Sequence, residues 1–181
     1  MDSSGRSRDD HGLVVRHDTT VESTLAPSIG VVLGVRFARG WEEEEAIPPC
    51  GSDDLAVSVR WIRTAGGGLQ GEVVAENVSG QPCRLGNKPA LRPLGVDGQP
   101  LGVDQAITLE LRIPPFVILQ PGQRASAPIS WSGWRGRPAS GRIIVSWEGG
   151  TAAVDAKGPL QPGPPKRGVG GLSSSWFSLI S

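Results

Sequence analysis

The hydrophobic pattern of the chain changes at Cys50. From there on, apolar residues alternate with polar ones in short runs, for example at Leu55, Val57, Val59 and Trp61. A period of two places one face of a strand against a core and the other face toward water. The runs are expected as strands, and none has the spacing of a convincing helix. They cover residues 55–61, 69–77, 83–94, 107–113, 116–119, 125–131, 143–147, 151–157 and 172–180.

Turn residues separate these runs. Asp97-Gly98 predicts a type I′ hairpin, and Gly149-Gly150 predicts a second two-residue hairpin. Gln120-Pro121-Gly122 predicts a turn with proline at the second position and glycine at the third. Pro89 and Pro93 favour an edge or interrupted strand. Short strands at roughly ten-residue spacing predict an all-β fold, an immunoglobulin-like antiparallel β-sandwich.

The sequence divides into a leader and one domain. Residues 1–48 are polar and charged, so we expect a disordered or weakly ordered N-terminal leader. Within it, the apolar run Ile29–Phe37 is interpreted either as a stray strand or as a short segment that docks on the domain. Residues 49–181 are predicted as the β-sandwich, in which a Pro/Gly linker at 158–171 leads to a closing strand.

Composition and charge exclude several classes of protein. With 26 glycines and 16 prolines among 181 residues, a helix bundle or coiled coil is excluded. Eighteen basic and eighteen acidic residues cancel, and no basic stripe is present, so we expect no nucleic-acid partner. No apolar run approaches the ~18 residues of a membrane helix, so no membrane span is expected in this chain. The polar start MDSSGRSRDD is unlike a signal peptide.

The sequence offers no constellation for catalysis. Both histidines, His11 and His17, lie in the leader, so the domain lacks the usual base of a catalytic triad. Two cysteines alone cannot complete a tetrahedral metal site. Glu72, Glu76 and Glu110 are candidates for a glycosidase carboxylate pair, but each falls on an outward strand face, where solvated charge is expected. We therefore predict no enzyme activity, no metal and no cofactor.

Cys50 and Cys83 lie just before the first predicted strand and just after the second. A disulfide between them would stabilise a sandwich, whereas two unpaired, buried thiols are usual in the cytosol. The residues alone leave both states open.

Several motifs resemble a known family. They are Cys50-Gly-Ser-Asp-Asp-Leu55, Ala75 to Gly86 with Asn77 and Cys83, Pro89, Asp97-Gly98, and Leu119 to Trp131 with Pro121-Gly122. Together they resemble the bacterial domain-of-unknown-function family numbered four-two-three-two, found mostly in actinobacteria, over roughly residues 50–150. The resemblance implies a secreted or lipid-anchored immunoglobulin-like domain with a Cys50–Cys83 disulfide, and it implies no activity. The chain departs from the family in lacking an export signal or lipobox and in the Asn87-Lys88 insertion.

The motif residues also have a structural interpretation. Asn77 is expected to satisfy turn amides before Ser79-Gly80 and to tolerate a left-handed conformation. Gly86 is expected to permit a close backbone approach beside the cysteines. Asn77-Val78-Ser79 also satisfies the glycosylation sequon, which we interpret as a turn without a glycan.

Six tryptophans with no tyrosine are the remaining signal. Trp61, Trp131 and Trp147 are in phase with apolar strand residues and are expected in the core. Trp134 differs, because it lies in a polar loop between Gly133 and Arg135. The sequence does not place Trp176 and Phe177 in the core or on the surface.

The Trp134 loop has two interpretations. With Arg135 and Arg137, an exposed Trp134 indole would stack on a sugar ring or anchor a protein partner. In the other interpretation, the indole folds back over the end of the sandwich and the arginines are solvated.

These features lead to one functional expectation and two alternatives. We expect a non-enzymatic, extracytoplasmic β-sandwich that acts as a binding or structural module of the cell envelope, with a protein or glycan partner. The first alternative is a carbohydrate-binding module that uses Trp134, Arg135 and Arg137. The second is an intracellular protein-interaction domain with reduced cysteines.

Overall fold

The computed structural model describes residues 46–63, 67–106, 109–113, 115–164 and 171–181. The predicted leader therefore lies almost entirely outside the described residues, and its apolar run Ile29–Phe37 lies wholly outside them. The described residues contain strands and no helix, which confirms the all-β prediction. The strands are β1 (Leu55–Arg63), β2 (Leu69–Asn77), β3 (Cys83–Gly86), β4 (Ala90–Gly95), β5 (Phe116–Leu119), β6 (Arg124–Ser132), β7 (Ala139–Trp147), β8 (Gly150–Asp155), β9 (Gly171–Ser174) and β10 (Ser178–Ile180).

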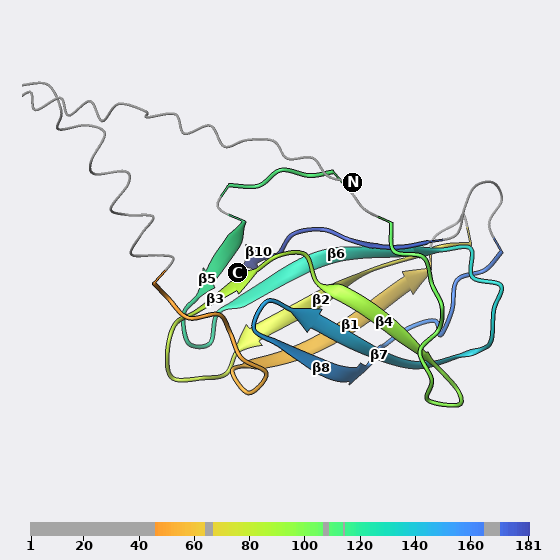
Figure 1. Cartoon of the computed structure of the whole chain (residues 1–181), viewed down its shortest axis with the longest axis horizontal. Coiled ribbons are helices and arrows are strands. Elements are labelled where there is room, and N and C mark those ends of the chain that lie inside the picture. Colours follow the sequence, from red (N-terminus) through yellow and green to blue (C-terminus); the bar gives the residue numbers. More distant parts are fainter. Residues whose placement is uncertain (1–45, 64–66, 107–108, 114, 165–170) are drawn as a thin grey trace, which may run out of the picture.

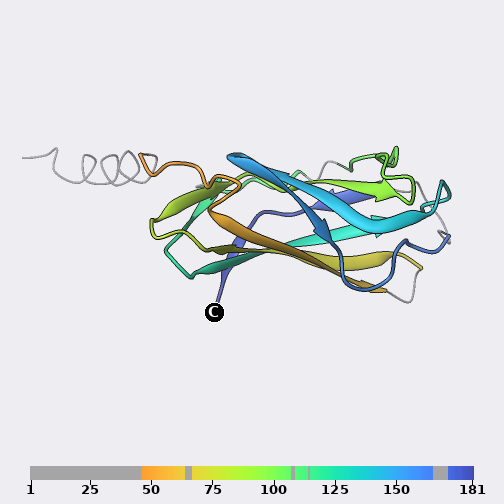
Figure 2. The same ribbon diagram turned by 90° about the horizontal axis from the view of Figure 1, so that it is seen from below.

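The strands form two layers, which are seen from the side in Figure 2. One layer is a sheet in the order β1-β2-β6, and both β9 and β10 pair with the far edge of β6. The other layer contains the three-stranded sheet β4-β7-β8 and the two-stranded sheet β3-β5 (Figure 1). Every strand pairing in the described part is antiparallel. The architecture is the expected antiparallel, immunoglobulin-like β-sandwich.

The space between the layers is filled as the period-two pattern predicts. In β1, Val59 and Trp61 are buried and Ser58 and Arg60 lie on the other face. The three tryptophans expected in the core are buried, and the Trp61 and Trp131 rings lie 6.2 Å apart. The other large, fully buried side chains of the core include Leu69, Val73, Leu85, Leu119, Ile143, Val145 and Leu172.

Backbone hydrogen bonds close both sides of the sandwich. On one side, Lys157 follows β8 and bridges to β1, because its N–H donates to the Val59 carbonyl (2.9 Å) and its carbonyl accepts from Trp61 N–H (2.7 Å). On the other side, Leu172 of β9 donates to the Asp104 carbonyl (2.8 Å) and accepts from Ala106 N–H (2.8 Å). Each bridge therefore gives part of an outer strand, β1 or β9, a second backbone partner, which shortens its free edge.

The prediction of a strand at 107–113 is wrong for residues 109–113. Residues 107 and 108 lie outside the described residues, and residues 109–113 form no strand. Leu109, Leu111 and Ile113, expected to be half-buried, are 98%, 103% and 82% exposed. Alternation shows which residues share a face, but it does not show whether that face points toward the core.

Of the three turns predicted from the sequence, one is confirmed and two differ from the prediction. Gly122 has a φ of 76° and Gln123 N–H donates to the Gln120 carbonyl (2.9 Å), which confirms the Pro-Gly turn. The type I′ prediction at Asp97-Gly98 is wrong, because Gly98 has positive φ and Asp97 does not. Instead, Gly98 N–H donates to the Gly95 carbonyl (2.8 Å) in a longer loop.

The remaining differences from the prediction are a shift of the second hairpin loop and breaks in two strands. Trp147 pairs with Gly150, so the two-residue loop is Glu148-Gly149 rather than Gly149-Gly150. The predicted 83–94 strand is interrupted, as Pro89 and Pro93 suggested, and its halves β3 and β4 lie in different sheets. The closing strand at 172–180 is also divided, into β9 and β10.

Candidate functional site

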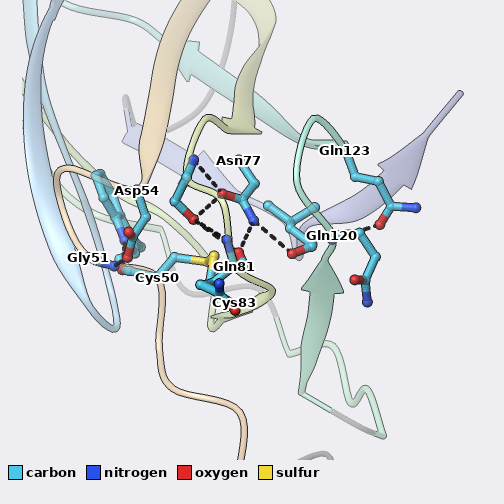
Figure 3. Close-up of a disulfide and its surroundings, with 11 residues drawn as sticks. Cys50, Gly51, Asp54, Asn77, Gln81, Cys83, Gln120 and Gln123 are labelled. Carbon is cyan, nitrogen blue, oxygen red and sulfur yellow. Dashed lines mark hydrogen bonds between the residues drawn. A yellow bond between two sulfur atoms is a disulfide. The ribbon is translucent and has the colours of Figure 1, made fainter.

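The disulfide predicted from the family resemblance is present between Cys50 and Cys83 (Figure 3). Their Cα atoms lie 4.9 Å apart, and both residues are buried. Cys50 N–H donates to the Arg84 carbonyl (2.9 Å), so the chain enters the domain paired with β3. Trp147 Nε1 donates to the Cys50 carbonyl (2.7 Å) and ties β7 to the same point. We call this region (Cys50, Asn77, Cys83, Leu119 and Trp147) the disulfide end.

Asn77 is the buried polar residue at the disulfide end. Its Oδ1 accepts from the N–H and the hydroxyl of Ser79 (2.9 and 2.8 Å). Its Nδ2 donates to the carbonyls of Gln81 (2.8 Å) and Leu119 (2.9 Å). The prediction that Asn77 satisfies a turn is confirmed, although its φ is not left-handed. The sequon side chain is fully buried, which agrees with the turn interpretation.

The remaining motif residues also support the backbone. Asp54 accepts from Gly51 N–H (2.7 Å) through its carboxylate and from Val78 N–H (2.8 Å) through its carbonyl. We expected Gly86 to permit a close approach of backbone, but the group next to it is a side chain. A Cβ there would overlap the carboxylate of Glu148, which lies 3.0 Å from Arg84 in an ion pair. The contacts of these motif residues are therefore mostly structural.

The Trp134 loop, residues 133–138 between β6 and β7, is the predicted binding site. The Trp134 indole is half-buried, and its ring lies 6.1 Å from that of the buried Trp131. Trp134 Nε1 donates to the Arg137 carbonyl (2.7 Å) across the loop. A Cβ at Gly136 would overlap the indole, so glycine is required there for the ring to lie against the loop. Trp134 therefore folds back over the sandwich rather than standing free.

The two arginines of the loop have different roles. Arg137 forms an ion pair with Asp97 of the neighbouring β4 loop and donates to the Pro100 carbonyl (3.2 Å). It therefore fixes the Trp134 loop against the 95–100 loop. Arg135 is exposed and forms no ion pair with any residue that the structure describes. Of the three predicted residues, Arg135 is the one whose charge is available to a ligand.

A shallow depression of about 270 Å³ lies beside this loop. Trp131 and Trp134 line it together with Val103, Asp104 and Arg135. Trp131 Nε1 is buried and has no hydrogen-bond acceptor among the described residues. Indole surface, a guanidinium and a carboxylate suit a small polar ligand that also presents an apolar face. Sequence reasoning missed Val103 and Asp104, because they lie about thirty residues before the loop and carry no local motif.

The predicted carboxylates pair with cations. Glu72 lies 3.5 Å from Arg60, and Glu76 lies 3.7 Å from Arg124. The exposed Glu110 lies 3.3 Å from Lys88. Within the described ranges, no group of three or more metal-ligating side chains occurs, and no helix could cross a membrane.

Residues 50–173 match the family described as Domain of unknown function (DUF4232). The chain belongs to this family. The DUF4232 match begins at Cys50 and extends into β9, beyond the limit near residue 150 that the motifs had suggested. It includes the whole disulfide end and the Trp134 loop. No curated protein and no solved structure shows a significant match to this chain.

Proposed function

We propose that this DUF4232 domain is a non-enzymatic binding or structural module of the cell envelope that works outside the cytoplasm. The Cys50–Cys83 disulfide is the observation that carries the proposal. Disulfides persist in oxidising compartments and are rare in the cytosol, where thiols are kept reduced. Both cysteines are buried where the chain enters the domain, so the bridge belongs to the scaffold rather than to a reactive surface.

The absence of an enzyme activity is supported by the distribution of catalytic side chains. The described residues contain no histidine, so they supply no imidazole base for a nucleophile. Glu72, Glu76 and Glu110 each pair with a cation, which is the ordinary state of surface charge. A rigid β scaffold with function in its loops agrees better with binding.

The oxidation state in the source cells tests the proposed location. Cells are quenched in acid, free thiols are alkylated, and the intact mass is measured with and without prior reduction. We expect both cysteines to react only after reduction, and we expect the protein in the envelope or secreted fraction. Alkylation of both cysteines without reduction, with the protein in the cytosolic fraction, would support the intracellular alternative and refute the proposal.

Carbohydrate is the second candidate ligand, and the depression beside Trp134 favours it. An indole face, a free guanidinium and the Asp104 carboxylate together suit a sugar ring with its hydroxyl groups. The structure changes the expected roles, because Trp134 and Arg137 hold the loop while Arg135 reaches solvent.

A glycan array probed with the full chain tests this candidate. Arg135→Ala should weaken binding by about tenfold, the effect of losing one charged hydrogen bond. Arg142→Ala, which changes another exposed arginine, on β7, is the matched control and should bind normally. No binding by the parent protein, or equal loss in both variants, would exclude a sugar site at this loop.

A further inference from the structure

Residues 109–113, which we call the exposed arm, are the least expected feature of the surface. Leu109, Leu111 and Ile113 are 98%, 103% and 82% exposed. Single exposed leucines are common, but three large aliphatic side chains so exposed within five residues are unusual. Such a face usually marks a surface that is covered in the working protein.

The polar side of the exposed arm is fixed to the body. The Glu110 carbonyl accepts from Trp176 Nε1 (3.2 Å), and the Glu110 carboxylate pairs with Lys88 (3.3 Å). Arg112 donates to the Phe177 carbonyl. Because polar contacts hold residues 110 and 112 against the segment before β10, the three aliphatic side chains between and beside them point outward.

We propose that the apolar face of residues 29–37, in the segment before the domain, covers the exposed arm. Ile29, Val31, Leu33, Val35 and Phe37 occupy alternate positions, so an extended chain presents all five on one face. Both segments carry large apolar side chains at alternate positions, and residues 29–37 carry five of them against three in the exposed arm. Burying these leucine and isoleucine side chains removes apolar surface from water and so favours docking.

The chain before residue 46 is long enough to reach the exposed arm. Pro48 lies beside Arg84 of β3, and Arg84 lies opposite Ile118 of β5. Ile113 precedes Ile118 by five residues and is therefore about 20 Å from Pro48, given about 3.3 Å per residue and about 5 Å between strands. The eight residues between 37 and 46 give nine Cα–Cα steps, which span up to about 30 Å. The chain can therefore double back along the small β3-β5 sheet.

Charge favours this occupant over a second copy of the chain. Residues 1–49 carry five arginines against nine carboxylates, and the remaining residues carry thirteen basic against nine acidic groups. The two parts attract each other, and the covalent link gives the leader a high effective concentration. A stable dimer buries about 800 Å² on each partner, which is more than three aliphatic side chains supply.

Photo-crosslinking in the full chain tests the contact. A benzoylphenylalanine replaces Leu111, whose full exposure makes the change compatible with folding. The matched control carries it at Val96, which is 71% exposed in the loop after β4. We expect position 111 to crosslink within its own chain to residues 29–37, and position 96 not to do so. Crosslinks between two chains, or none above the Val96 control, would overturn the proposal.

A substitution in the leader gives an independent test. Leu33→Asp should release the exposed arm, so the amides of residues 109–113 should exchange hydrogen about tenfold faster, as expected for the loss of one buried leucine. Val15→Asp places the same charge in the leader outside the apolar run and should leave that exchange unchanged. Equal exchange in the parent and both variants would show that residues 29–37 do not cover the exposed arm.

Discussion

Asn77 shows how one side chain can join three separate pieces of backbone. It lies at the end of β2, and its amide connects the 78–82 turn to Leu119 of β5. The site needs two donors and an acceptor within one small group, and asparagine has these in its side chain. Aspartate would lose both donors and bury a charge, and alanine would leave the carbonyl groups unpaired.

Replacing Asn77 with alanine should lower the free energy of unfolding by about 3 kcal/mol, because buried hydrogen-bonding groups lose their partners. Ser79→Ala is the matched control. It removes one hydroxyl at the exposed side of the same turn and should cost about 1 kcal/mol. Urea unfolding followed by tryptophan fluorescence measures both values. A loss in Asn77→Ala no larger than that in Ser79→Ala would contradict the role assigned to the amide.

At the scale of elements, strands were predictable where the alternating face also packs on the core. Trp61, Trp131 and Trp147 follow this rule, and each lies in its predicted strand. The exposed arm has the same alternation, but its orientation is decided by contacts of Glu110 and Arg112 with residues 65 or so positions away. Local sequence carries no information about such contacts, so this expectation failed.

For the candidate site, the sequence predicted the residues of the loop but not the residues that pack beside it. Trp134, Arg135 and Arg137 were found because an aromatic residue stood among glycines and arginines in a polar loop. The sequence could not show that Arg137 pairs with Asp97, forty residues away, or that Asp104 lines the same depression. Both depend on how β4 and its following loop pack beside β6 and β7.

The turn between β5 and β6 depends on one glycine. Gly122 has a φ of 76°, where a side chain is strained, so Gly122→Ala should cost about 1 kcal/mol or more of stability. Gly80→Ala is the control, because Gly80 has no positive φ and a Cβ there meets nothing within 4 Å. Thermal unfolding of the two variants should show a lower Tm for Gly122→Ala alone. Equal Tm values would mean that the turn relaxes without cost.

At the scale of the whole molecule, the sandwich is closed by covalent and backbone links at its margins. The bridges at Lys157 and at Leu172 link one point on each side, and the disulfide end fixes the entry of the chain. The core alone therefore does not determine how the outer segments are held. Cys50, Asn77 and Cys83 of the family motif lie at the disulfide end, where their contacts support the fold.

Reducing the disulfide should lower the free energy of unfolding by about 4 kcal/mol, the chain-entropy value for cysteines 33 positions apart. Denaturant unfolding of the oxidised protein, of the reduced protein and of the Cys50→Ala/Cys83→Ala variant measures this loss. The last two should agree, which separates the effect of the bond from side reactions of the reductant. Unchanged stability in both would show that the bridge does not constrain the unfolded chain.

The position of the disulfide has a mechanical consequence. Tension applied between residue 46 and the C-terminal strands passes directly from Cys50 to Cys83. The hairpin of β1 and β2 lies inside the bridged loop, so it bears none of this force once the sheets have separated. Stretching an oxidised molecule should therefore yield a contour length shorter by roughly 110 Å than stretching a reduced one, at about 3.4 Å per residue. The bond thus shields nearly a fifth of the polypeptide from pulling.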